Sequence, residues 1–123
     1  MEWNITAGRP VYLQLMEQLE LAIVTGVYPP GSRVPPVREL AADAGVNPNT
    51  MQRALQELES RGLLQTQRTA GRTVTEDTEL LGSLRRQRAL ALTRDFLQQM
   101  RDLGFAPEEV RSLLESTATK EEG

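Results

Sequence analysis

The segment at residues 37–62 reads VRELAADAGVNPNTMQRALQELESRG and predicts two helices joined by a very tight turn. Its first helix spans about residues 37–44, and Gly45 can take the left-handed conformation that ends it. After one intervening residue come Asn47, which suits an N-cap, and Pro48, which suits the first position of a helix. A second helix therefore begins almost at once, and the segment is a helix, a tight turn and a helix.

The second helix, over about residues 48–61, has two faces of different chemistry. The apolar face recurs at three- and four-residue steps and is formed by Met51, Ala54, Leu55 and Leu58. Another face at the same spacing is formed by Asn49, Gln52, Arg53 and Gln56. A merely solvated face is usually rich in Glu and Lys, whereas Asn, Gln and Arg pair with adenine and guanine edges in the major groove. The polar face therefore indicates the reading of a DNA groove.

The composition of the chain argues against catalysis. Its 123 residues are enough for one compact domain, or for a small domain with an appended element, and they include no cysteine and no histidine. This excludes disulfides, thiol nucleophiles, zinc sites and every acid/base scheme that uses histidine. We therefore expect a protein that is not an enzyme and that has no metal and no cofactor.

Positive charge is concentrated in the middle of the chain. The net charge is -3, from 14 Lys and Arg against 17 Asp and Glu. Residues 28–75 nevertheless carry six arginines against four acidic residues and form the only basic block. Lys120 is the sole lysine, so every cation of the block is a guanidinium, the group suited to bidentate contact with phosphate and guanine edges. The pattern indicates local binding to DNA despite the acidic total.

A helix and a hairpin flank the central segment. Apolar residues at three- and four-residue steps predict a helix over about residues 10–25. Residues 63–67 and 72–75 predict two short strands joined by a turn. Arg68 and Arg72 flank the tip of this hairpin, where a guanidinium could enter a minor groove or touch the DNA backbone. The alternative is that the two arginines only keep an edge hairpin soluble.

The last part of the chain predicts a helical hairpin. A long apolar stripe spans about residues 78–103, Gly104 ends it, and a short helix follows from Pro107. Two helices alone cannot form a hydrophobic core of their own, so their apolar faces must pack on the first domain, on a second copy of the chain, or on both. We favour a homodimer over a plain intramolecular cover. The residues expected at its interface are Leu81, Leu84, Leu92, Phe96, Met100, Leu103, Phe105, Val110, Leu113 and Leu114.

The N-terminus does not predict a signal peptide. The N-terminus lacks a basic segment followed by an apolar run, and no stretch approaches the ~20 apolar residues of a membrane span. We expect a cytoplasmic protein without a membrane partner. The expected organisation is a DNA-binding domain at residues 1–76, a helical dimerisation region at 77–117 and a disordered polar tail at 118–123.

Five short motifs lie within residues 9–75. They are PVY at 10–12, YPPGSRVP at 28–35, VRELA at 37–41, GVNPNT at 45–50 and LESRGL at 58–63. Together they resemble the winged helix-turn-helix of the GntR family of transcription regulators. The carboxyl part, through LGFAPEE at 103–109, resembles the short two-helix dimerisation region of the YtrA subfamily. The resemblance implies a mainly α fold with a small β-hairpin, in which a winged helix-turn-helix is followed by a C-terminal two-helix hairpin.

The resemblance also implies which residues meet DNA. In such regulators an arginine early in the second helix contacts DNA, the recognition helix enters the major groove and the wing lies near an adjacent minor groove. The matching positions here are Arg38, Asn47, Asn49, Thr50, Gln52, Arg53, Arg68, Thr69, Gly71 and Arg72. The implied function is a sequence-specific transcription regulator, a repressor that binds a palindromic operator as a homodimer. A winged-helix module that binds a protein instead of DNA is the alternative, and the existence of a small-molecule effector stays open.

Overall fold

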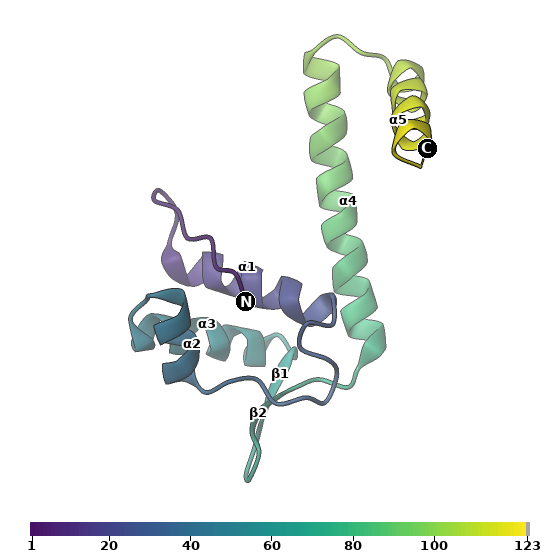
Figure 1. Ribbon diagram of the computed structural model, residues 1–123. Coiled ribbons are helices and arrows are strands. Elements are labelled where there is room, and N and C mark those ends of the chain that lie inside the picture. Colours follow the sequence, from purple (N-terminus) through teal and green to yellow (C-terminus); the bar gives the residue numbers. More distant parts are fainter. Residues whose placement is uncertain (123) are drawn as a thin grey trace. The chain divides into compact units, whose positions relative to one another are not determined.

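The computed structural model describes residues 1–122, which form five helices and one two-stranded antiparallel sheet (Figure 1). The elements are α1 (Val11–Val24), α2 (Val37–Ala44), α3 (Pro48–Ser60), β1 (Leu64–Gln67), β2 (Gly71–Val74), α4 (Thr78–Asp102) and α5 (Pro107–Glu122). The chain divides into two compact units, one from Met1 to Arg85 and one from Arg86 onward. The predicted fold class, mainly α with a small hairpin, is confirmed.

The helix-turn-helix forms as its sequence predicts. α2 ends at Gly45, whose φ of 71° lies in the left-handed region. The side chain of Asn47 caps α3, because its Oδ1 accepts a 2.7 Å hydrogen bond from the backbone N–H of Asn49. Pro48 stands in the first turn of α3, where a backbone N–H would have no partner in the helix. The cap sets where α3 begins and therefore which residues its first turns present.

An apolar core holds the first unit together. Its largest fully buried side chains are Leu15, Leu19 and Ile23 on α1, Met51, Leu55 and Leu58 on α3, and Leu63 and Val74 at the hairpin. Burial of each such side chain contributes about 1.5–3 kcal/mol. Because α3 buries one face against α1, its rotation is fixed and its polar face is turned away from the core.

The wing is a short hairpin that follows α3. β1 and β2 pair antiparallel, from Leu64 opposite Val74 to Gln67 opposite Gly71. The turn between them comprises residues 68–70. The predicted strands were residues 63–67 and 72–75, so β1 begins one residue later than predicted, and β2 both begins and ends one residue earlier.

A third segment, residues 31–34, lies along the edge of β2, and the sequence did not predict this pairing. The backbone N–H of Val34 donates a 3.0 Å hydrogen bond to the carbonyl of Arg72. Arg33 forms an antiparallel bridge with Thr73. The pairing brings Arg33 beside the wing, although it lies far from the wing in sequence.

The first turns of α4 belong to the first unit. Leu81 is 7% exposed within the apolar core, and Leu84 is half-buried against that core. Both residues were predicted to lie in a dimer interface. The structure corrects this for Leu81, which the core of its own unit buries, and the interface role of the half-buried Leu84 stays a prediction. The two compact units meet inside α4, between Arg85 and Arg86.

α5 is longer than the sequence predicted. It continues to Glu122, whereas residues 118–123 were expected to form a disordered tail, of which Gly123 lies outside the described residues. No glycine or proline interrupts residues 108–122, so nothing in that stretch stops the helix. At its start, the carboxylate of Glu109 accepts a 3.1 Å hydrogen bond from the backbone N–H of Ala106. This bond is the carboxylate half of a capping box, without the side-chain bond that Ala106 cannot make, and it contributes to where α5 begins.

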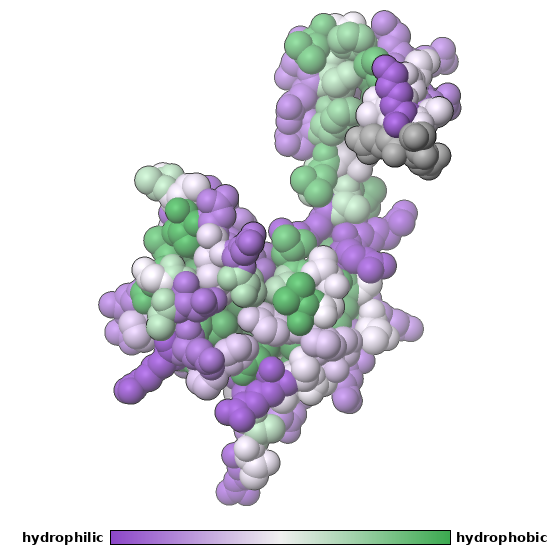
Figure 2. All heavy atoms as spheres, in the orientation of Figure 1, coloured by the Kyte–Doolittle hydropathy of each residue, from purple (hydrophilic) through white to green (hydrophobic). Residues whose placement is uncertain are grey.

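Apolar side chains lie exposed on the second unit (Figure 2). They are Leu90, Leu92, Phe96, Leu103, Phe105, Leu113 and Leu114, and Leu92 and Leu103 are each 71% exposed. Val110 is only 3% exposed, so the structure corrects its predicted place in a dimer interface: the chain itself buries it. None of the helices within residues 1–122 combines the length and the apolar character needed to cross a membrane.

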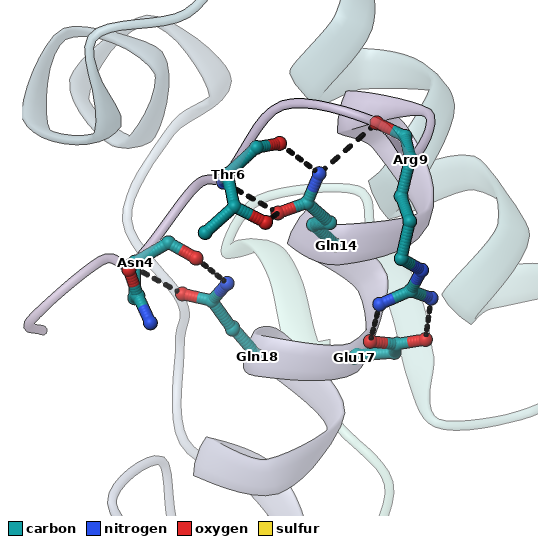
Figure 3. A network of polar contacts seen from close by, with 6 residues as sticks. All are labelled: Asn4, Thr6, Arg9, Gln14, Glu17 and Gln18. Carbon is teal, nitrogen blue, oxygen red and sulfur yellow. Dashed lines mark hydrogen bonds and ion pairs between the residues drawn. The ribbon is translucent and has the colours of Figure 1, made fainter.

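The N-terminal segment lies along α1 and is held there by two glutamines (Figure 3). Gln18 accepts a 2.9 Å hydrogen bond from the backbone N–H of Asn4 and donates a 2.8 Å bond to its carbonyl. Gln14, which is 3% exposed, makes the same pair of bonds with Thr6. The indole N–H of Trp3 donates to a carboxylate of α2 at 2.9 Å. The segment thereby links α1 to α2, a contact that hydrophobic periodicity does not reveal.

Candidate nucleic-acid interface

The polar face of α3 points outward because the apolar face of the same helix is buried in the core. Asn49 and Arg53 are exposed, and Thr50 and Gln52 are half-buried. The guanidinium carbon of Arg53 lies 3.6 Å from the ring centre of Tyr12 on α1. This cation–π contact contributes about 0.5–1 kcal/mol at an exposed site. It engages the flat face of the guanidinium and leaves the N–H donors at its edge for another partner.

Besides Arg53, whose guanidinium stacks on Tyr12, three arginines of the basic block have side chains without a hydrogen-bond or ion-pair partner within residues 1–122. They are Arg33 beside β2, Arg38 on α2 and Arg68 in the turn of the wing, and all three are exposed. Arg61 of the same block differs, because it pairs with the buried Glu20 at 3.2 Å. Exposed guanidinium groups without an acidic partner are suited to bind phosphates.

A pocket of about 310 Å³ lies between the start of α2 and the wing. It is lined by Arg33, Val34, Pro35, Pro36, Val37, Thr66, Gly71 and Arg72. Pro36 is the N-cap of α2 and provides no side-chain cap, so the first backbone N–H groups of the helix lack a side-chain partner. A helix N-terminus carries partial positive charge, and here it adds to the charge of Arg33. The pocket is therefore suited to a phosphate of a nucleic-acid backbone.

Arg72 lies differently from the sequence-based expectation. Its Nε pairs with Oε1 of Glu59 near the end of α3, and its Nη1 donates a 3.3 Å hydrogen bond to Oε1 of Gln52. Thr66 on β1 also donates to Glu59, at 2.8 Å. The guanidinium that was expected to enter a minor groove or to touch the DNA backbone instead contacts Glu59 and Gln52, and these contacts tie the wing to α3.

The pKa of the Glu59 carboxyl reflects these contacts. Burial alone would raise it, but the hydrogen bonds from Arg72 and Thr66 and the charge of Arg72 together hold the pKa of Glu59 below its ordinary value. Glu59 is therefore ionised at neutral pH, and the link between the wing and α3 persists there.

The other predicted DNA-contacting residues lie at the ends of the elements. Asn47 uses its Oδ1 as the cap of α3, which leaves its amide N–H groups for a phosphate. Thr69 is exposed in the turn of the wing. Gly71 opens β2 with a φ of 74°, and a Cβ there would lie 3.5 Å from Nε of Arg33. A larger residue at position 71 would therefore be strained in its backbone.

Residues 11–74, from α1 to the end of β2, match the model of a known protein family. The family is described as bacterial regulatory proteins, gntR family. The chain belongs to the GntR family. The match covers the helix-turn-helix and the wing, the parts that carry the candidate interface.

Two relatives of this GntR-family chain are from Bacillus subtilis (strain 168). The uncharacterized HTH-type transcriptional regulator YhcF is 34% identical over 123 residues, which are 100% of this chain and 99% of the relative. The HTH-type transcriptional repressor YtrA is 36% identical over 73 residues, which are 59% of this chain and 56% of the relative. The predicted resemblance to the GntR family, with YtrA among the similar proteins, is confirmed.

Two solved structures are similar to this GntR-family chain. A GntR family transcriptional regulator from Listeria monocytogenes has a TM-score of 0.83 and 35% identity, and the match covers 91% of this chain and 98% of that chain. AraR(DBD) in complex with operator ORE1 has a TM-score of 0.53 and 27% identity, over 61% of this chain and 94% of that chain. The relatives and structural neighbours are transcription regulators. The chain is therefore a DNA-binding transcription regulator and not an enzyme, and the alternative of a protein-binding module is not favoured.

Sequence reasoning missed three parts of the candidate interface. Arg33 was counted only as a member of the basic block, and its motif gave no sign that it pairs along β2. Tyr12 was assigned to the apolar stripe of the first helix, although it also lies beneath Arg53. Glu59 was not singled out, because its contact with Arg72 joins two elements and follows no regular spacing.

Proposed function

We propose that this GntR-family chain is a sequence-specific repressor that binds a palindromic operator as a homodimer. The observation that carries the proposal is the presence, in one unit, of the Asn, Gln and Arg face of α3 together with three unpaired guanidinium groups. Such a face offers donors and acceptors that match base edges, and such cations neutralise phosphates. α3 enters a major groove and the wing lies near the adjacent minor groove.

The residues divide between the two tasks by their chemistry and position. Arg33, Arg38 and Arg68 bind phosphates, because their side chains have no partner among the described residues. Base edges are read by Asn49, Thr50, Gln52 and Arg53 on α3. Asn47, through its side-chain amide, Thr69, through its exposed side chain, and Gly71, at the turn of the wing, support contacts with the DNA backbone. We infer repression, and not activation, from the similarity to YtrA, which is named a repressor.

Exposed apolar side chains on the second unit support the homodimer. Leu92, Phe96, Leu103, Phe105, Leu113 and Leu114 are exposed, and Met100 is half-buried. A cluster of large exposed apolar residues marks an interaction surface, and a two-helix unit cannot bury such residues by itself. A two-fold dimer addresses half-sites about one helical turn, ~34 Å, apart. Action on chromosomal DNA would place the protein in the cytoplasm.

Selection of bound fragments from a random double-stranded DNA pool tests this proposal, followed by titration of the enriched duplex at several salt concentrations. We expect enrichment of an inverted repeat, two chains bound per duplex, and an affinity that falls steeply with salt. Enrichment of no sequence by an intact dimer would contradict sequence-specific binding. One chain per duplex would contradict the homodimer.

A further inference from the structure

Gln52, in the middle of the polar face of α3, is held by a residue of the wing. Nη1 of Arg72 donates a 3.3 Å hydrogen bond to its Oε1. Arg72 is itself fixed from the other side by the ion pair with Glu59, and Thr66 holds that carboxylate at 2.8 Å. The side chain of Arg72 is only 18% exposed and that of Glu59 28% exposed. We call the partly buried chain of contacts from Glu59 through Arg72 to Gln52 the relay.

The relay determines which end of the Gln52 amide faces outward. A guanidinium has five N–H donors and no acceptor, so only the oxygen of the glutamine amide can face Arg72. The amide NH2 group, which carries two donors, is left for the nucleic acid. A free glutamine pairs with adenine by accepting from N6 and donating to N7. The bond from Arg72 occupies one of the two lone pairs of this oxygen and turns it toward the wing. Gln52 therefore keeps its donors for the base, and its acceptor is weaker and less well aimed for the pairing with adenine than that of a free glutamine.

We propose that Arg72 is a positioning residue that makes Gln52 a hydrogen-bond donor, so that Gln52 selects guanine over adenine. Guanine presents two acceptors, O6 and N7, in the major groove and no donor there. The inference rests on the proposed function and deepens it by naming the base class that one residue reads. It also removes Arg72 from the set of direct DNA contacts, while Arg68 at the tip of the same wing remains one.

Selection from a random DNA pool, run in parallel on four forms of the full chain, tests this inference. The forms are the wild type, Gln52→Ala, Arg72→Met and Arg68→Met. Gln52→Ala identifies the base pair that Gln52 reads, because preference should be lost at that position of each half-site only. Arg68→Met is the matched control, because it removes the same charge from the same hairpin without touching Gln52.

In the wild type we expect guanine at the position identified by Gln52→Ala. In Arg72→Met the ratio of adenine to guanine at that position should rise on the order of tenfold, because the amide can now turn its oxygen to the base. The slope of log affinity against log salt should stay at its wild-type value in this variant. In Arg68→Met the base preference should be unchanged and the slope should become less negative by about 1.8 for two chains.

Several results would overturn the inference. Adenine at this position in the wild type would do so directly. A base preference that Arg72→Met leaves unchanged, combined with a shallower salt slope, would make Arg72 a phosphate contact instead. If Arg72→Met loses its helical circular dichroism, Arg72→Thr takes its place, because threonine favours strands and also removes the guanidinium that donates to Gln52, so the preference should shift in the same direction. Failure of the wild type to enrich any sequence would refute the proposed function itself. This outcome differs from a failure of the inference alone, in which the wild type enriches a sequence without the expected guanine.

Discussion

Replacing Arg38 with alanine should remove a phosphate contact and leave the fold intact. Arg38 is exposed in the first turn of α2, and its side chain has no partner among residues 1–122. Alanine is the residue most favourable to helices, so α2 should keep its stability. In the proposed homodimer the substitution removes two guanidinium groups from each complex.

The magnitude follows from the two phosphates that each complex no longer neutralises. Each neutralised phosphate contributes about −0.9 to the slope of log affinity against log salt, so the slope should become less negative by about 1.8. Between about 50 and 200 mM salt, this difference in slope changes the ratio of the wild-type affinity to the variant affinity about tenfold. The variant should be weaker at low salt and should approach the wild type as salt rises.

The assay is fluorescence anisotropy of a labelled duplex with the selected operator, and of a scrambled duplex, over that salt range. The loss should be the same for both duplexes, because a phosphate contact carries no sequence information. Arg9→Ala is the control, because it removes the same charge from a residue that is paired with Glu17 on the surface. An unchanged slope for Arg38→Ala, or an equal change for Arg9→Ala, would refute the reasoning.

Three further predictions concern stability and assembly. Asn47→Ala should lower the free energy of unfolding by about 1 kcal/mol in urea titrations, because α3 loses its cap, whereas Asn47→Asp should retain most of it. Phe96→Glu should shift the chain to a monomer in sedimentation equilibrium, because it places a charge on the exposed apolar surface, and a persistent dimer would count against that surface. The stabilisation from Glu59, whose pKa is lowered in the folded chain, should be present above the ordinary carboxyl pKa and lost as pH falls through the lowered value. Glu59→Gln should therefore lose less stability than the wild type between neutral and acid pH, and parallel stability curves would contradict this.

The helix-turn-helix could be predicted from the sequence because its determinants are local. Gly45 ends one helix, Asn47 caps the next, and both interactions span only a few residues. The three- and four-residue spacing of apolar residues in α3 likewise predicted which face is buried, and therefore which polar face points outward. For these reasons the residues proposed to read bases could be found from the sequence alone.

Contacts between distant segments could not be predicted in the same way. The pairing of Arg33 along β2 and the ion pair of Arg72 with Glu59 depend on how the elements pack, and no spacing in the sequence encodes them. Periodicity also shows which face of a helix is apolar without showing what covers it. Leu81 was therefore placed in a dimer interface, although the core of its own unit buries it.

The most direct test of the account is a titration of the 15N-labelled chain with its selected operator, followed by nuclear magnetic resonance. The account predicts that chemical shifts change most at the side-chain amides of Asn49 and Gln52, at the first turn of α2 and at the turn of the wing. Shifts confined to α5 or to the N-terminal segment, with α3 unaffected, would contradict the claim that α3 reads the DNA.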